Sequence, residues 1–246
     1  MTSPLQIPTF RHWVLTSLLL LATLASPLAH SQSACSSDNQ PLPSALFERF
    51  INADCDTCWR DPAAPPAPRD ALALDWIVPG SRGDDAPLAA AASTDALARL
   101  AELQVARPAM QTQPVSAIKG WPKAALRVAH GPAVGDYMGL LIALSLPQSS
   151  ALALPLSGWV VLLEALPVGT EGSSVPRYLV RNALQPLWDK REQLSNQETL
   201  SFNDLRAMGI PQGVDARRLR VASWVQDAHG QILTAVQSAC QPEDKN

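Results

Sequence analysis

Apolar residues in this chain form short runs that proline, glycine and polar positions interrupt. Residues 45–52 (ALFERFIN) and 71–78 (ALALDWIV) are two such runs, and the second stops at Pro79-Gly80. Apolar runs of this length, bounded by turn residues, predict buried strands. On the same grounds we predict strands over residues 125–129, 138–146, 158–166, 177–184 and 219–226, and a strand or short helix over 231–238.

Helical spacing is clearest in residues 89–104, where Leu97 and Leu100 fall on one helix face. A second, short helix is predicted over residues 202–208, with Ser201 as its N-cap. The predicted fold class is therefore α/β (α+β), with a β-rich second half.

The composition narrows the class of protein. The chain has 246 residues, 22 of them proline, and a formal net charge of −3. Because Lys and Arg are not in excess, little positive charge is available to neutralise phosphates, and we expect no nucleic-acid partner. The proline content argues against a helical bundle and favours short elements joined by stiff loops.

The N-terminal segment has the features of a cleavable signal peptide. Arg11 and His12 precede an apolar run over residues 13–25, which is short for a bilayer span. Small residues suit cleavage after Ser31 or Ser33. The sequence therefore predicts a periplasmic or secreted protein with no membrane attachment after cleavage.

Four cysteines allow three disulfide connectivities, and export favours their oxidation. Cys55 and Cys58 are two residues apart, as C-D-T-C, which makes them the first expected pair. The remaining pair, Cys35–Cys240, would join the two ends of the mature chain. In the chain-entropy model, a loop of about 200 residues is worth about 4–5 kcal/mol.

A C-x-x-C that follows a strand in an exported chain is a redox signal. The spacing lets the second sulfur attack a mixed disulfide formed by the first. Cys55 would then be the attacking thiol, Cys58 the resolving thiol, and Trp59 a cover that excludes water. We expect no cofactor and no metal site, because the cysteine and histidine spacings match no zinc pattern.

The order of motifs resembles that of a secreted proteobacterial thioredoxin-like family. The 45–52 strand, C-x-x-C-Trp and 71–78 strand look like the opening βαβ unit of thioredoxin-like proteins. The later matching motifs are Gly135-Asp136-Tyr137-Met138-Gly139, the strand holding Glu164, residues 178–182 (YLVRN) and residues 226–230 (QDAHG). The resemblance covers about residues 45–238, and it implies a thioredoxin-like core with a β-rich C-terminal extension. It implies no settled activity.

That resemblance gives the expected organisation of the chain. The parts are a signal peptide (1–31), a polar lead-in (32–44), a single thioredoxin-like domain (45–240, its β-rich extension over about 125–238) and a tail (241–246).

Two features near the dithiol depart from the thioredoxin-like pattern. Residues 60–70 hold four prolines, so the helix that would favour the Cys55 thiolate is missing or vestigial. Asp54 and Asp56 flank Cys55, and negative neighbours disfavour a thiolate.

The resemblance also implies a cis-proline that faces the dithiol. Pro108 and Pro114 are the two candidates, and neither follows the usual Thr or Val.

Two functions remain open from the sequence. The first is thiol–disulfide exchange with a protein thiol or disulfide partner, which would make the chain a thiol-disulfide oxidoreductase. The second is a non-catalytic periplasmic binding or structural module, in which Cys55–Cys58 and Cys35–Cys240 serve stability. The oligomeric state is left open.

Other polar residues have structural interpretations. Glu164 and Arg181 are expected to pair across neighbouring strands, or to line a polar pocket. His130 is expected to be a hydrogen-bonding residue at a strand end.

Overall fold

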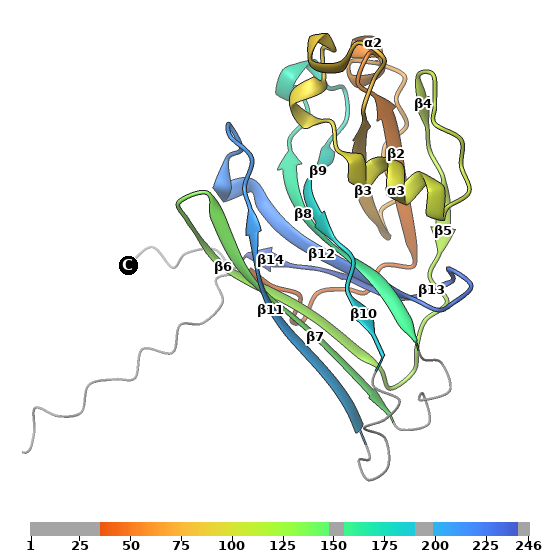
Figure 1. The fold of residues 1–246 in the computed structure, drawn as a ribbon, viewed down its shortest axis with the longest axis vertical. Coiled ribbons are helices and arrows are strands. Elements are labelled where there is room, and N and C mark those ends of the chain that lie inside the picture. Colours follow the sequence, from red (N-terminus) through yellow and green to blue (C-terminus); the bar gives the residue numbers. More distant parts are fainter. Residues whose placement is uncertain (1–34, 148–154, 190–198, 241–246) are drawn as a thin grey trace, which may run out of the picture. The chain divides into compact units, whose positions relative to one another are not determined.

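A computed structural model describes residues 35–147, 155–189 and 199–240, so the predicted signal peptide and tail lie outside the described residues. The strands are β1 (Cys35–Ser36), β2 (Ala45–Asn52), β3 (Ala71–Val78), β4 (Gln111–Thr112), β5 (Val115–Ala117), β6 (Ala125–Val134), β7 (Tyr137–Pro147), β8 (Leu156–Leu166), β9 (Arg177–Leu184), β10 (Leu187–Trp188), β11 (Thr199–Gly209), β12 (Leu219–Gln226), β13 (Ile232–Gln237) and β14 (Ala239–Cys240). They form two sheets (Figure 1). Sheet A has the order β11-β7-β6-β1-β14. Sheet B has the order β13-β12-β8-β9-β3-β2-β4, with β10 on β8 and β5 on β2.

The prediction of an α/β (α+β) fold with a thioredoxin-like core is wrong, because the described chain is mostly β-sheet. β2 and β3 are parallel neighbours, as a βαβ unit requires. The segment between them, however, holds a single helical turn, α2 (Asp56–Trp59). Prolines at 62, 65, 66 and 68 exclude a regular crossover helix there. The long later strands pair antiparallel and extend the structure as sheet instead.

Individual strands were more predictable than their arrangement. β2, β3, β9 and β12 have the predicted bounds. The predicted short helix over residues 202–208 is wrong, because this segment lies within β11 and pairs with β7 along its whole length. Leu200, Phe202 and Met208 are buried, at even spacing along the strand, and this two-residue period marks a strand face.

The predicted helix over residues 89–104 forms in two pieces. A 3-10 turn, η2 (Ala89–Ala91), precedes α3 (Thr94–Glu102). The break falls where Ala92 bridges Ile77 of β3. Ser93 is the N-cap of α3, and its side chain accepts a hydrogen bond from the Asp95 N–H at 3.0 Å. The other 3-10 turns are η1 (Gly83–Asp85), η4 (Thr170–Gly172) and η6 (Ala216–Arg218).

Sheet B is buried on both faces. Val160 and Leu162 of β8 belong to an apolar cluster that sheet A shares through residues such as Ile142. Val161, between them, belongs to a second cluster that includes Leu100 of α3. Because successive strand residues face opposite sides, a strand covered on both faces reads as a continuous apolar run. Among the described residues, no helix has the length and hydrophobicity that a membrane crossing needs.

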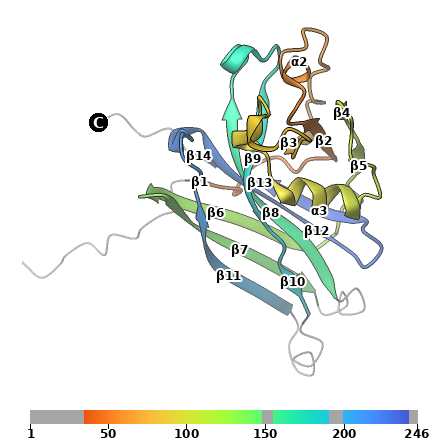
Figure 2. The same cartoon turned by 45° about the horizontal axis from the view of Figure 1, so that its top comes forward.

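Helix α3 lies against sheet B (Figure 2). A buried charge pair joins it to the sheet, in addition to apolar packing. Arg99 lies 2.8 Å from a Glu48 carboxylate oxygen, and both side chains are almost fully buried. The Arg99 guanidinium also lies over the Trp224 ring, 5.1 Å from its centroid. Trp76 and Trp159 complete a run of packed indoles that α3 and sheet B enclose.

Candidate functional site

The Cys55–Cys58 disulfide lies just after the C-terminal end of β2. Its sulfurs are 2.00 Å apart, and its Cα atoms are 5.4 Å apart. Cys55 is 9% exposed and Cys58 is 3% exposed. Cys55 occupies the N-cap position of α2 but makes no side-chain cap hydrogen bond. Since α2 is one turn long, it supplies little of the helix dipole that supports a reactive thiolate.

An apolar cluster surrounds this disulfide. Trp59, which is 2% exposed, belongs to the cluster together with both cysteines. The other buried members come from β2, β3, β8, β9 and the intervening loops: Ile51, Ala53, Ile77, Ala86, Leu166 and Leu179. The disulfide is thus part of the packed interior rather than a group that projects into solvent.

The two carboxylates that flank Cys55 have partners of their own. Asp54 accepts hydrogen bonds from the Ser81 hydroxyl and the Ser81 N–H, both at 2.7 Å. These bonds, the hydroxyl first, hold the pKa of Asp54 below its ordinary value. Asp56 forms an ion pair with Arg60 at 3.2 Å. The lowered pKa keeps Asp54 negatively charged beside the disulfide at neutral pH.

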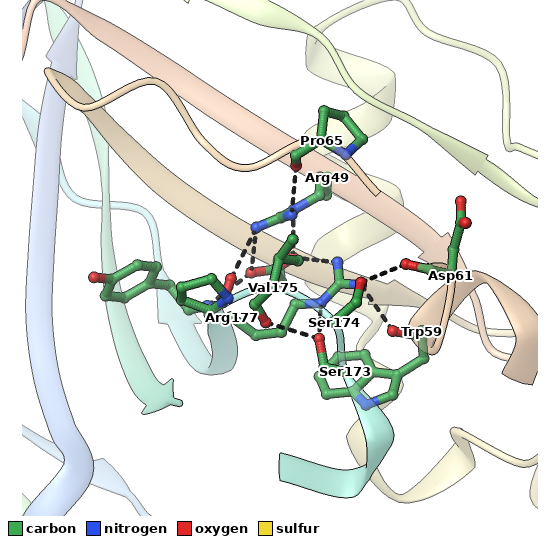
Figure 3. A network of polar contacts seen from close by, with 11 residues as sticks. Arg49, Trp59, Asp61, Pro65, Ser173, Ser174, Val175 and Arg177 are labelled. Atoms are coloured by element: carbon green, nitrogen blue, oxygen red, sulfur yellow. Dashed lines mark hydrogen bonds and ion pairs between the residues drawn. The ribbon is translucent and has the colours of Figure 1, made fainter. Parts of the chain in front are cut away.

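Arg177, at the start of β9, fixes the residue that follows the disulfide. Its Nη2 donates to the Trp59 carbonyl at 2.9 Å, and its guanidinium carbon lies 5.0 Å from the Trp59 ring centroid. Its Nε donates to Ser173 Oγ at 2.8 Å. Figure 3 shows Arg177 among these partners. The side chain is fully buried, so the contacts are shielded from water.

Asp75, in the middle of β3, balances two buried guanidinium groups. Its Oδ1 lies 2.7 Å from Arg49 Nε and 3.2 Å from Arg177 Nη1. Arg49 in turn donates to the carbonyls of Pro65 and Pro176, each at 3.2 Å. The proline-rich segment after the disulfide is therefore anchored on sheet B by Arg49, and Trp59 by Arg177 (Figure 3).

The two candidate prolines lie beside different positions of β2. The Pro108 carbonyl accepts a hydrogen bond from Asn52 Nδ2 at 3.0 Å, at the end of β2 from which Cys55 departs. The Pro114 carbonyl accepts from the Glu48 N–H at 3.1 Å, four residues earlier in β2. Of the two, Pro108 is on the side of the disulfide.

The Cys35–Cys240 disulfide joins two neighbouring strands of sheet A. Its sulfurs are 1.99 Å apart and the bridge spans 205 residues. Cys35 also lies directly opposite His130 of β6. His130 Nδ1 is 3.0 Å from the Gly131 carbonyl oxygen, so the expected hydrogen bond forms. The expected position is wrong, because His130 lies inside β6, beside a register shift, rather than at a strand end. Burial, together with the charge of Arg220, lowers the pKa of His130.

The expected Glu164–Arg181 pair is confirmed. Arg181 Nη2 lies 2.6 Å from Glu164 Oε2, across β8 and β9. The other Glu164 oxygen accepts from the Asp215 N–H at 3.3 Å. Glu164 is 3% exposed, so this is a nearly buried pair with little room for a ligand at the carboxylate.

Two hollows are relevant to binding. The larger, of about 580 Å³, lies on sheet B where β3, β9 and β12 begin and β13 ends. The smaller, of about 210 Å³, lies beside the Cys55–Cys58 loop. The larger is lined by charged and aromatic side chains such as Arg69, Arg220 and Tyr178, and the smaller by Trp59, Leu88 and Arg181 among others.

No protein-family model and no curated protein matches this chain. Among solved structures, HBP35 of Porphyromonas gingivalis is similar, with 10% sequence identity and a TM-score of 0.47. The match covers 83% of this chain and 76% of that chain. Similarity at this level supports no statement about the function of this chain.

Sequence reasoning missed the buried ionic network and the neighbourhood of His130. Glu48, Arg49 and Asp75 stand inside otherwise apolar strands, and a charge at such a position signals a buried partner. The strand sequence does not show which residue the partner is, because Arg99 and Arg177 come from distant segments of the chain.

Proposed function

We propose that this protein is an exported, non-catalytic binding module in which both disulfides serve stability. The observation that carries the proposal is the environment of Cys55–Cys58. Both cysteines lie in an apolar cluster, and Arg177 holds the next residue, Trp59, by a carbonyl hydrogen bond and a ring contact. An exchanging thiol is partly exposed and lies in an electropositive setting. The apolar cluster opposes the first condition, and the Asp54 carboxylate beside Cys55 opposes the second.

Export is supported by the disulfides themselves. Both bonds are present, and the described residues include no free cysteine. Disulfides persist in oxidising compartments and are rare in the cytosol.

The 580 Å³ hollow is the ligand site in this proposal, since its volume falls in the range of small-molecule pockets. Leu42 and Leu72 give it apolar walls, and the positive charges of Arg69 and Arg220 outnumber the single carboxylate of Asp70. Among the described residues, Arg220 donates only to the backbone carbonyls of Arg217 and Leu219 and pairs with no carboxylate. A ligand with an apolar body and a carboxylate or phosphate group would pack its body against the leucines and pair its anionic group with the arginines.

Calorimetric titration with octanoate and with inorganic phosphate tests this site. We expect saturable binding of octanoate that weakens at least tenfold in Arg220→Ala, since a guanidinium–anion contact of about 1.5–3 kcal/mol is lost. Arg206→Ala is the matched control, because Arg206 pairs with Asp204 on sheet A and is exposed. Equal binding by Arg220→Ala and the parent would contradict the site.

Thiol–disulfide exchange is the second candidate. It is favoured by the position of the C-x-x-C at the end of β2 and by the small hollow beside Trp59, into which a partner peptide could fit. An insulin-reduction assay with dithiothreitol decides between the two functions. The binding-module proposal predicts no rate above that of a Cys55→Ala/Cys58→Ala variant.

A further inference from the structure

Strand β1 places Cys35 between two residues that share its face of sheet A. Cys35 is directly opposite Cys240 of β14 on one side and His130 of β6 on the other. Residues directly opposite each other in an antiparallel ladder point to the same face. Accordingly, both sulfurs and a His130 ring nitrogen lie within 4.8 Å of one another.

One ring nitrogen of His130 has no hydrogen-bond partner in the part of the chain that the structure describes. Nδ1 is 3.0 Å from the Gly131 carbonyl, which can only accept, so Nδ1 carries the hydrogen. Nε2 is then an unprotonated acceptor. It is buried, and it has no hydrogen-bond partner among the described residues. His130 as a whole is 4% exposed, so bulk water does not satisfy this atom.

This arrangement has the parts of a metal site. Histidine ligands commonly donate their second ring N–H to a backbone carbonyl, which leaves the other nitrogen free for the metal. Two thiolates and one imidazole are ligands that Zn²⁺ prefers, at about 2.0–2.3 Å from each donor atom. Donor atoms around such a centre are about 3.3–3.8 Å apart. The bonded sulfurs, 1.99 Å apart, are too close, whereas two separate thiols could reach this spacing.

We propose that Cys35, Cys240 and His130 form a zinc site that opens when the Cys35–Cys240 bond is reduced. A dithiol reductant supplies two electrons and two protons to the S–S bond and is itself oxidised to a disulfide. Both released thiols then lose their protons to solvent, and the two sulfurs and Nε2 donate lone pairs to Zn²⁺. Water completes the fourth position. Strands β1 and β14 stay joined in either state, by the disulfide or by the ion. This site goes beyond the proposed function and does not depend on it.

The test uses the full mature chain with Cys55→Ala and Cys58→Ala, so that one cysteine pair remains. Zn²⁺ is titrated against a chromogenic chelator before and after reduction with a phosphine, because dithiols bind zinc themselves. We expect one Zn²⁺ per reduced chain and none per oxidised chain. His130→Ala should weaken binding at least tenfold. His229→Ala, an exposed histidine in the turn after β12, should leave the affinity unchanged.

A reduced chain that binds no Zn²⁺, or one that binds equally well as His130→Ala, would overturn the proposal. If reduction unfolds the chain, thermal melting tests the same zinc site. Zn²⁺ must then restore the melting transition of the reduced parent and fail to restore that of reduced His130→Ala, and any other pattern contradicts the site.

Discussion

The two disulfides of this protein are chemically the same bond, but they differ in the length of the loop that they close and in their surroundings. Cys35–Cys240 joins residues 205 apart and lies within a sheet, between β1 and β14. Cys55–Cys58 joins residues 3 apart and lies in a loop that the apolar cluster and Arg177 already hold. In the chain-entropy model, a disulfide constrains the unfolded chain more when it closes a longer loop, with a logarithmic dependence on loop length. The comparison therefore teaches that the long bridge stabilises the fold, whereas the short bridge shapes a loop that ion pairs stabilise.

The largest effect is expected on removal of the long bridge. Cys35→Ala/Cys240→Ala should lower the free energy of unfolding by about 4–5 kcal/mol, since the unfolded chain regains the entropy of its largest loop. Urea denaturation measures the loss. A loss no greater than that of the short-bridge variant would break the comparison.

The next effect is expected from the charge that anchors the short-bridge loop. Asp75→Asn leaves Arg49 and Arg177 buried without a counter-charge, which should cost about 3–5 kcal/mol. Asp204→Asn is the control, because its pair with Arg206 is exposed and should contribute less than about 1 kcal/mol. Comparable denaturation midpoints for the two variants would show that the network does not hold the loop.

Removal of the Cys55–Cys58 bridge should lower the free energy of unfolding by less than removal of Cys35–Cys240 or the Asp75→Asn substitution. Cys55→Ala/Cys58→Ala releases only a very short loop, and the chain-entropy model gives about 1–2 kcal/mol. The part of the near-ultraviolet circular dichroism that Trp59→Phe removes from the parent should persist in this double variant, because Arg177 still holds Trp59. Loss of that signal in a variant that is still folded would show that the disulfide, and not Arg177, orders the loop.

The smallest effect is a pH dependence from His130. Its pKa is lowered in the folded protein, so the unfolded chain binds the proton more readily. The stability that neutral His130 contributes is present above the unfolded pKa of about 6.5 and is lost as the pH falls below it. The urea midpoint of the parent should therefore fall more between about pH 7.5 and pH 5 than that of His130→Gln. His229→Gln should behave like the parent, and an equal fall in all three proteins would exclude His130 as the cause.

The same two regions show what the sequence could and could not predict. The Cys55–Cys58 pair and the bounds of β2 and β3 follow from local spacing and continuous apolar runs, and both were predicted correctly. The pairing of Cys35 with Cys240 followed by elimination. The position of His130 beside Cys35 could not be predicted, because the register of β1 on β6 joins segments that are 95 residues apart (130 − 35 = 95). The thioredoxin-like core was wrong for a related reason. A C-x-x-C after a strand specifies a local motif, whereas the sheet order depends on where β8, β9 and β12 pair.

β11 was mistaken for a helix because Leu205 and Ala207 break its alternation on the solvent side. Leu205 is 78% exposed, and only the pairing with β7 makes the strand assignment evident.

The reduction potential of the Cys55–Cys58 bond, measured in Cys35→Ala/Cys240→Ala or by mass-resolved alkylation of the parent, tests the structural role of this bond most directly. A bond held inside an apolar cluster by its surroundings should have a potential below about −300 mV, as structural disulfides do. A potential between about −230 and −120 mV, the range of exchange proteins, would contradict a structural role and favour thiol–disulfide exchange.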